Sequence, residues 1–337
     1  MRLAFEDVSY SYVDPSSRTR KKRRGKKDEK KADWGNAPDA LWALRHVSFT
    51  VEPGEFLGIA GHTGSGKSTL IQHMNGLVHP TEGRVLADGE DLADKRVAHQ
   101  VRQSVGLVFQ YPENQLFANT VFDDVAFGPR NMKLPEDEVE RRVRHGLELV
   151  GLDVDKLGER SPFDLSGGQQ RRVAFAGVLA MEPSVLVLDE PVAGLDPLSR
   201  ADFLQLIADL HAGGLTVVMV SHSMEDLAAL SDRILVLSEG EVFALGTPAE
   251  VFADAPALKA IGLGAPAPQA FASLLREAGF ALPRALYSEA ALADDLAAQL
   301  GGVPASEGAG DAVLVDIVEA EGEGDVPSTD ALEADHG

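Results

Sequence analysis

Two short stretches of this chain carry residue types suited to binding and cleaving phosphate groups. The first, GHTGSGKST at residues 61–69, matches the pattern G-x-x-x-x-G-K-[ST] and lies between an apolar segment and a helix-like one. Its glycines let successive backbone N–H groups surround phosphate oxygens, and the N-terminus of the following helix adds positive charge. We therefore predict a nucleotide phosphate site formed by Gly61, His62, Thr63, Gly64, Ser65, Gly66, Lys67, Ser68 and Thr69.

The second stretch, VLVLDE at residues 185–190, is an apolar run that ends in two carboxylates. In a nucleotide site, Lys67 would neutralise the β- and γ-phosphates of ATP, and Ser68 would hold Mg²⁺. Asp189 is then placed to orient the metal through water or through Ser68, and Glu190 to polarise the attacking water. The alternatives are a glycine-rich turn without a ligand and an Asp-Glu pair that merely begins a loop. Both become weak because the two stretches occur together.

The composition excludes several classes of chemistry. The chain has no cysteine, so disulfides, thiolate metal sites, iron–sulfur clusters and cysteine nucleophiles are excluded, which fits a reducing compartment. The N-terminus MRLAFEDVSY has charged residues where a signal peptide needs apolar ones, and no run of 18 apolar residues occurs. We expect a protein that is neither secreted through a signal peptide nor membrane-spanning.

The apolar segments that must position the phosphate-binding residues have the pattern of a parallel sheet. FLGIA (56–60), SVLVLDE (184–190), LTVVMVS (215–221) and RILVLS (233–238) are nearly continuous apolar runs, separated by intervals of helix length. Strands that are buried on both faces and joined by helical crossovers have this signature. The predicted fold class is therefore α/β.

Two segments outside this pattern are strongly charged. Between β-type segments at 3–10 and 46–51, which predict a hairpin, residues 14–40 form a polar interval without periodicity. Its centre, SSRTRKKRRGKKDEKK (16–31), holds ten basic and two acidic residues, whereas residues 301–337 hold ten acidic residues and no Lys or Arg. Both segments are predicted to be disordered. We interpret the basic one as a solvated loop insertion, with contact to anionic lipid or to the acidic tail as a further hypothesis.

A basic run also suggests nucleic-acid binding, and the overall charge argues against it. The chain carries a formal charge of −22, and without residues 16–31 it holds 21 basic and 51 acidic residues, a charge of −30. Such a body repels nucleic acid. A soluble nucleic-acid-acting ATPase is therefore kept as an alternative, and no specific nucleic acid is expected as a partner.

A third motif, LSGGQQRRVA at residues 165–174, resembles the signature sequence of ATP-binding cassette (ABC) proteins. The other motifs of that family occur in the same order as in its members. Gln110 resembles the Q-loop residue, AGLDP (193–197) the D-loop, and His222 in VSHS the switch histidine. The resemblance covers about residues 1–250, apart from the basic interval.

The resemblance implies a P-loop NTPase fold of the ABC type within residues 1–255. Its parts would be a RecA-like parallel-sheet core, an antiparallel β subdomain and a helical signature subdomain. Tyr12 in VSYSY matches the aromatic residue that stacks on adenine, with Tyr10 as the second choice. The implied catalytic residues are Glu190, His222, Lys67 and Gln110, and the implied Mg²⁺ ligands are Ser68, Gln110 and Asp189.

The ABC family builds each ATP site from two subunits. In such a head-to-tail dimer, the signature of one subunit closes on the nucleotide that is held by the P-loop of the other. The signature lies before a predicted helix and so forms a second anion-binding N-terminus. We expect a homodimer or heterodimer with a second ABC ATPase. Val192 stands where a Thr or Ser usually precedes the D-loop Ala in that family, so the rate of ATP hydrolysis is not predicted. The predicted nucleotide-binding set also includes Ser166, Gly167, Gly168, Gln169 and Asp196.

A finer resemblance lies in FQYPENQLFANTVFDDVAFGPRN at residues 109–131, which is similar to the ATPases of energy-coupling factor transporters. It implies a peripheral ATPase on the cytoplasmic face of the cell membrane that powers uptake of a vitamin or transition-metal ion. The implied partners are a transmembrane scaffold (T component) and a separate substrate-binding membrane protein (S component). Residues 256–300 resemble the helical segment that contributes to ATPase pairing in that family. The ATPase of another ABC importer is the alternative. A regulatory module without catalysis is disfavoured by the intact Asp189, Glu190 and His222.

In that family, the region after the Q-loop forms a groove for coupling helices of the scaffold. We predict an apolar lining and an acidic complement to basic scaffold residues. The alternative is that the apolar residues only pack the helical subdomain. The predicted lining is Leu116, Phe117, Val121 and Phe127, and the predicted acidic residues are Glu113, Asp123 and Asp124.

Overall fold

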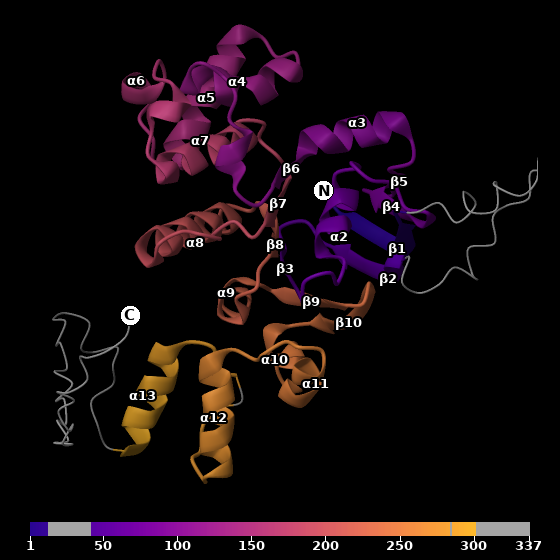
Figure 1. Cartoon of the computed structure of the whole chain (residues 1–337), viewed down its shortest axis with the longest axis vertical. Coiled ribbons are helices and arrows are strands. Elements are labelled where there is room, and N and C mark those ends of the chain that lie inside the picture. Colours follow the sequence, from indigo (N-terminus) through magenta and orange to yellow (C-terminus); the bar gives the residue numbers. More distant parts are fainter. Residues whose placement is uncertain (13–41, 284, 301–337) are drawn as a thin grey trace, which may run out of the picture. The chain divides into compact units, whose positions relative to one another are not determined.

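The computed structural model describes residues 1–12, 42–283 and 285–300 (Figure 1). The chain divides into one compact unit, Met1–Leu292, and a second, Ala293–Gly337. Of the second unit, the described residues are 293–300, the end of helix α13 (Glu289–Leu300). The predicted disorder of residues 14–40 and 301–337 lies outside the described residues.

A six-stranded sheet forms the centre of the first unit, with the strand order β10-β9-β3-β8-β7-β6. Five strands run parallel, and β10 pairs antiparallel with β9. Every residue of β3 and β8 is buried, which explains why these strands are apolar throughout. The α/β prediction is confirmed. The strands are β3 (Phe56–Gly61), β6 (Val105–Val108), β7 (Val185–Asp189), β8 (Thr216–Val220), β9 (Arg233–Ser238) and β10 (Glu241–Gly246).

A second, antiparallel sheet has the strand order β2-β1-β4-β5. Its strands are β1 (Leu3–Ser11), β2 (Trp42–Val51), β4 (Glu82–Ala87) and β5 (Glu90–Asp91). The antiparallel pairing of β1 with β2 confirms the predicted hairpin strands. Phe5 and Phe49 stack across this pair with ring centroids 4.6 Å apart, inside a core shared with α2 and one face of the central sheet.

Helices cover the central sheet and build a helical layer. Helices α4, α5 and α7 contact one another in this layer (Figure 1). Their apolar sides join a core that includes the other face of the sheet. The helices are α2 (Lys67–Met74), α3 (Lys95–Ser104), α4 (Val121–Asn131), α5 (Glu136–Leu149), α6 (Val154–Leu157), α7 (Gly167–Leu179), α8 (Pro197–Ala212) and α9 (Met224–Leu230), with 3-10 helices η3 (Pro112–Gln115) and η4 (Pro162–Asp164).

The C-terminal part of the first unit contains α10 (Pro248–Val251), α11 (Ala255–Ala260) and α12 (Ala267–Glu277). Within residues 256–300, α12 and α13 are separate helices, because α12 ends before Gly279, whose φ of 101° is left-handed. The backbone N–H of Ala267 donates to Glu225 of α9 at 2.9 Å, which holds this part on the sheet domain. The predicted boundary at residue 255 stays a prediction. In the part of the chain that the structure describes, no helix has the length and apolarity needed to cross a membrane.

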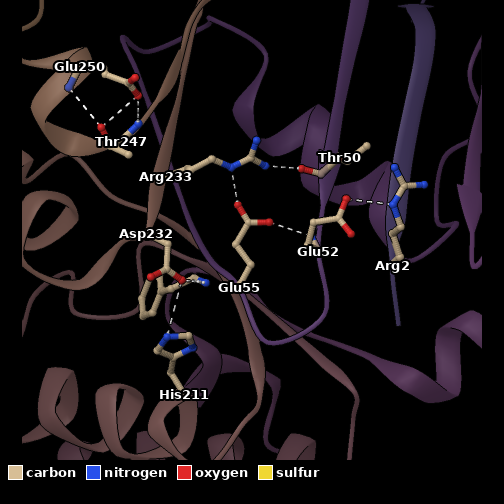
Figure 2. A network of polar contacts seen from close by, with 10 residues as sticks. Arg2, Thr50, Glu52, Glu55, His211, Asp232, Arg233, Thr247 and Glu250 are labelled. Carbon is tan, nitrogen blue, oxygen red and sulfur yellow. Dashed lines mark hydrogen bonds and ion pairs between the residues drawn. The ribbon is translucent and has the colours of Figure 1, made fainter.

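A polar network anchors the start of β3, the strand that leads into the phosphate loop (Figure 2). The Arg233 guanidinium donates to Glu55 Oε1 and to the Thr50 carbonyl, both at 2.7 Å. Asp232 accepts the backbone N–H of Phe56 at 2.8 Å. These contacts join β2, β3 and β9 at the N-terminal end of β3. They thereby help to position the C-terminal end of β3, where the phosphate loop begins.

Candidate functional site: a nucleotide cleft

The loop between β3 and α2 has the strand–loop–helix context that its motif requires. Gly66 caps α2 with a φ of 103°, a backbone conformation that L side chains rarely adopt. A Cβ at Gly66 would lie 2.5 Å from the Ala43 carbonyl oxygen, so the loop can approach β2 only with glycine here. Gly64, with a φ of 84°, has open space around its Cα. Because Gly64 has no side chain, its backbone is accessible to a ligand.

The loop borders a cleft of about 460 Å³ in which most of the predicted site residues meet. Ala43 of β2 is an additional lining residue that no sequence motif indicates. Gly61 and Ser65 are buried behind the loop and, with His62, are outside the lining. The lining consists of Tyr12, Ala43, Thr63, Gly64, Gly66, Lys67, Ser68, Thr69, Gln110, Asp189, Glu190 and His222.

Lys67 brings a positive charge to the floor of the cleft. Its ammonium donates to the carbonyl oxygens of Gly61 at 2.7 Å and His62 at 3.0 Å. An ammonium has three donors, so one is left for a phosphate oxygen. Burial lowers the pKa of Lys67, and the nearby Glu190 and Asp189 carboxylates oppose that effect. A bound polyphosphate would add further negative charge and favour the protonated form.

Ser68 and Asp189 supply neighbouring oxygen atoms at the mouth of the P-loop. The Ser68 hydroxyl donates to Asp189 Oδ2 at 3.3 Å. Burial raises the pKa of Asp189, and the Ser68 hydrogen bond together with the charges of Lys67 and His222 opposes the rise. Gln110, just after β6, lines the same cleft. Hydroxyl, carboxylate and amide oxygens are the donor types that Mg²⁺ prefers, so this set fits that ion.

Glu190 and His222 form a pair across the ends of two adjacent strands. Asp189 of β7 lies opposite Val220 of β8, which brings the residues after each strand together. His222 Nε2 lies 3.4 Å from Glu190 Oε1, and the His222 backbone N–H donates to Glu190 Oε2 at 3.4 Å. Burial raises the pKa of Glu190, with the His222 charge acting in the opposite direction. A φ of 52° at Glu190 turns its side chain out of the strand direction.

The structure distinguishes the two candidate tyrosines. Tyr12 is 64% exposed at the cleft, and its hydroxyl is 2.7 Å from Thr69 Oγ1 of α2. Tyr10 packs edge-on against the buried His73, with centroids 5.0 Å apart, and is outside the lining. Tyr12 is therefore the ring available to a base in this cleft, in agreement with the first choice from the sequence.

The signature residues do not join the cleft. Ser166 caps α7 by accepting from the Gln169 N–H at 3.4 Å, and Gln169 returns a capping-box contact. Ser166 and the two following glycines are exposed, with nothing within 4 Å of either glycine's Cβ position. Asp196 of the D-loop also lies outside the cleft, where it caps α8. Within one chain, the signature and the P-loop remain separate.

The three acidic residues after the Q-loop have partners within the chain, and their role as a complement to basic scaffold residues stays a prediction. Glu113 forms a two-point ion pair with Arg171, at 2.8 and 3.0 Å. Asp124 accepts the backbone N–H groups of Phe117 and Ala118, and Asp123 pairs with Arg130 at 2.8 Å. Glu113 and Asp124 are half-buried, whereas Asp123 is exposed and its ion pair lies at the surface.

Of the predicted apolar lining of the groove, some residues border a hollow and one does not. Phe117 and Phe127 are 59% and 50% exposed, with ring centroids 4.9 Å apart, and border a hollow of about 180 Å³ between η3, α4 and α7. Leu116 is buried at the edge of this hollow, whereas Val121 is buried in the core and does not line it. The sequence does not single out Arg171, because its partners Glu113 and Ala193 are distant in the chain.

Comparisons with known proteins agree with this geometry. A family model described as "ABC transporter" matches residues 44–193. A protein of Symbiobacterium thermophilum, named "Energy-coupling factor transporter ATP-binding protein EcfA2", is 62% identical over 247 residues, which are 73% of this chain and 85% of that protein. A protein of the same name from Latilactobacillus sakei is 44% identical over 304 residues, which are 89% of this chain and 97% of that protein.

Solved structures give the same result. The structure of cbiO1 from Clostridium perfringens, described as part of the ABC transporter complex cbiONQ, is 34% identical with a TM-score of 0.62, over 84% of this chain and 96% of that one. A dimeric ATP-binding cassette, MJ0796, bound to ADP and phosphate, is 28% identical with a TM-score of 0.58, over 73% of this chain and 98% of that one. The chain therefore belongs to the ATP-binding cassette ATPases and, among them, to the ATP-hydrolysing subunits of energy-coupling factor transporters.

Proposed function

We propose that this ATPase works as one half of a head-to-tail pair at the cytoplasmic face of the membrane. The proposal rests on the observation that the nucleotide motifs of one chain lie in two separate places. The cleft gathers the P-loop, the Asp189–Glu190 pair and His222, whereas the signature residues Ser166, Gly167 and Gly168 are exposed outside it. An exposed helix N-terminus with two open glycines suits a phosphate that another subunit holds.

In the proposed reaction, the cleft binds ATP with its base on Tyr12 and its phosphates on the P-loop amides and Lys67. Mg²⁺ held by Ser68, Gln110 and Asp189 would neutralise phosphate charge when bound. A water oxygen attacks the γ-phosphorus, its proton passes to the Glu190 carboxylate, and ADP leaves as the β–γ bridging bond breaks. His222, 3.4 Å from Glu190, is placed to orient that carboxylate and the γ-phosphate.

The second ATPase would complete both sites of the pair. The signature of each subunit closes on the ATP of the other, so the pair closes with nucleotide and reopens after hydrolysis. Helix α12 adds a candidate pairing surface, because Phe271 and Leu274 are 52% and 62% exposed and lie three residues apart on one helix face. Homodimer and heterodimer both satisfy this geometry.

The hollow beside Phe117 and Phe127 is the proposed contact for the transmembrane scaffold. Two exposed aromatic rings at the edge of a hollow offer an apolar seat for a helix from another protein. The hollow also adjoins η3, which Tyr111 connects to Gln110. Movement of a scaffold helix bound in this hollow would therefore displace Gln110, the residue proposed to contact the metal. This displacement would couple transport to ATP hydrolysis.

The proposed cargo is a vitamin or a transition-metal ion, selected by a separate substrate-binding membrane protein. The support is the energy-coupling factor name of the relatives and the cbiONQ complex of which cbiO1 is part. Val192 is buried and 5% exposed, so it packs in the core beside the D-loop and contributes no hydroxyl there.

Affinity isolation of the full chain from membranes, followed by identification of the co-purifying subunits, tests the proposal. We expect a transmembrane scaffold, a substrate-binding membrane protein and a second ATPase. The Phe117→Ser/Phe127→Ser variant should lose the scaffold and keep ATP binding, whereas Phe243→Ser, at an exposed ring on β10, should keep both. Recovery of nucleic acid without membrane proteins, together with hydrolysis stimulated by DNA or RNA, would refute the transporter assignment.

A further inference from the structure

Arg171 is a buried cation to which the reaction described above assigns no role. Its side chain is only 4% exposed, although it lies on α7 just five residues after Ser166. Four hydrogen bonds satisfy its guanidinium, and all of them reach other segments of the chain. Arg is seldom buried unless its donors are matched in this way. The contacts therefore define what Arg171 holds together.

The first segment that Arg171 holds is the one that follows Gln110. The guanidinium donates to Glu113 Oε2 through Nε at 3.0 Å and to Glu113 Oε1 through Nη2 at 2.8 Å. The Tyr111 ring centroid lies 5.8 Å from the guanidinium carbon, within the range of a cation–π contact. Tyr111 has a φ of 55°, and this strained backbone connects Gln110 to η3.

The second segment is the turn after Glu190. Arg171 Nη1 donates to the Ala193 carbonyl at 2.8 Å and more weakly to the Pro191 carbonyl at 3.5 Å. The Ala193 N–H in turn donates to the Glu190 carbonyl at 3.1 Å. Only one short turn therefore separates Arg171 from the backbone of the proposed general base.

The two held segments also contact each other beside Arg171. Gly194, with a φ of 76°, places its Cα so that a Cβ would lie 3.4 Å from the Tyr111 ring. Tyr111 is thus close to both the guanidinium and the D-loop backbone. Because α7 continues without a break from Ser166 to Arg171, a displacement of the signature end of the helix moves this whole cluster.

We propose that Arg171 is a positioning residue that connects the signature helix to both Gln110 and Glu190 of its own chain. This inference rests on the proposed head-to-tail pair, in which the signature contacts the partner's nucleotide while Gln110 and Glu190 serve the chain's own. Closure of the signature on one ATP is then transmitted through Arg171 to the other ATP. The ion pair with Glu113 provides the rigid part of this connection, since a two-point contact fixes orientation as well as distance.

Arg142 offers a matched control in the same helical layer. Its guanidinium donates to Glu138 at 2.7 Å and to the Met181 carbonyl at 3.1 Å, and its side chain is 15% exposed. It also pairs with Glu182 at 3.0 Å, and none of these partners belongs to a nucleotide motif. Arg142→Met therefore removes a partly buried arginine and its ion pairs without touching the proposed connection.

The test uses the full chain in its purified complex and measures kcat, KM, the Hill coefficient for ATP and the thermal midpoint of unfolding. Arg171→Met should lower kcat about 10- to 100-fold, the size expected when a reacting group is misplaced by about 1 Å. Its Hill coefficient should fall to unity, while the dissociation constant for ATP changes less than about threefold, because no atom of Arg171 lines the cleft.

Two further variants keep the test decisive if Arg171→Met folds poorly. Arg171→Lys keeps the charge and loses the two-point geometry, and Glu113→Gln keeps the shape and loses the charge. Each should reduce kcat and cooperativity in part. Adding Glu113→Gln to Arg171→Met should cause no further loss, because the two residues act through one contact.

The outcomes separate this inference from the proposed function. A cooperative wild-type complex in which the Arg171 and Glu113 variants match Arg142→Met in kcat and Hill coefficient refutes the role of Arg171 alone. A wild-type complex that hydrolyses ATP without cooperativity refutes the paired sites and this inference with them.

Discussion

Replacing Glu190 with Gln tests the assignment of the general base with little disturbance of the fold. The backbone contacts that hold this residue, its N–H to the Val220 carbonyl and its carbonyl to the Ala193 N–H, both at 3.1 Å, do not involve the side chain. Gln has nearly the same shape, so the contact with His222 can persist. Because burial raises the pKa of Glu190, its ionised form is disfavoured in the folded protein, and a neutral side chain should not lower the thermal midpoint.

The catalytic loss should be much larger than any structural effect. General-base catalysis contributes about 10²- to 10⁴-fold to a rate, or about 3 to 5 kcal/mol of barrier. We expect Glu190→Gln to lower steady-state phosphate release at saturating MgATP by that factor. Removal of one negative charge from the cleft should leave ATP binding intact or tighter, so that closed pairs accumulate and elute earlier in size-exclusion chromatography.

Glu239→Gln is the matched control for this experiment. Glu239 has the same φ of 52°, and its side chain is exposed in the β9–β10 turn and does not line the cleft. Its hydrolysis should equal that of the wild type. Undiminished phosphate release by Glu190→Gln in the purified complex would refute the reasoning, and an equal loss in Glu239→Gln would point to a backbone effect instead.

Three further predictions concern the same cleft. Lys67→Ala should raise the dissociation constant for MgATP about 10- to 100-fold, since hydrogen bonds to charged groups contribute about 1.5 to 3 kcal/mol. Calorimetry measures this constant, with Lys259→Ala at an exposed lysine as the control. An unchanged affinity would contradict the role of Lys67 in phosphate binding. Gly66→Ala should lower the free energy of unfolding by about 1 to 3 kcal/mol, because the φ of Gly66 is 103° and the new Cβ would lie 2.5 Å from the Ala43 carbonyl oxygen. Urea denaturation measures this free energy, and a variant as stable as the wild type would contradict the prediction. Burial raises the pKa of Glu190, so protonation should remove the base as pH falls through a pKa above the ordinary 4.5; an acid limb of kcat at or below that value would contradict the burial argument.

The chemistry of the P-loop could be predicted from the sequence because it is local. Gly66, Lys67 and Ser68 are neighbours in the chain, and a strand, a glycine loop and a helix in sequence leave little freedom in how they fold. The positions of Asp189, at the end of β7, and of His222, just after β8, were predictable for a related reason. Apolar runs that are buried on both faces pair in parallel, and the carboxyl ends of neighbouring parallel strands meet at one edge.

Contacts between distant segments could not be predicted in this way. Glu113 and Asp124 look like exposed acids in the sequence, and one partner of Glu113 lies 58 residues away, on a helix face that only packing defines. Likewise, no period distinguishes Val121, which is buried, from Phe127, which is half exposed. Which side of α4 is covered depends on α5, the next helix, and on α7, which lies further along the chain.

The sequence by itself determined the α/β class, the phosphate loop, the carboxylate pair and the family, because each is written in short spacings and apolar periodicity. Only the tertiary structure decided that Tyr12 faces the cleft while Tyr10 packs on His73, and that Arg171 connects the signature helix to Glu113. The physical reason is that burial and ion pairing depend on which surfaces meet, and those surfaces come from segments far apart in the chain.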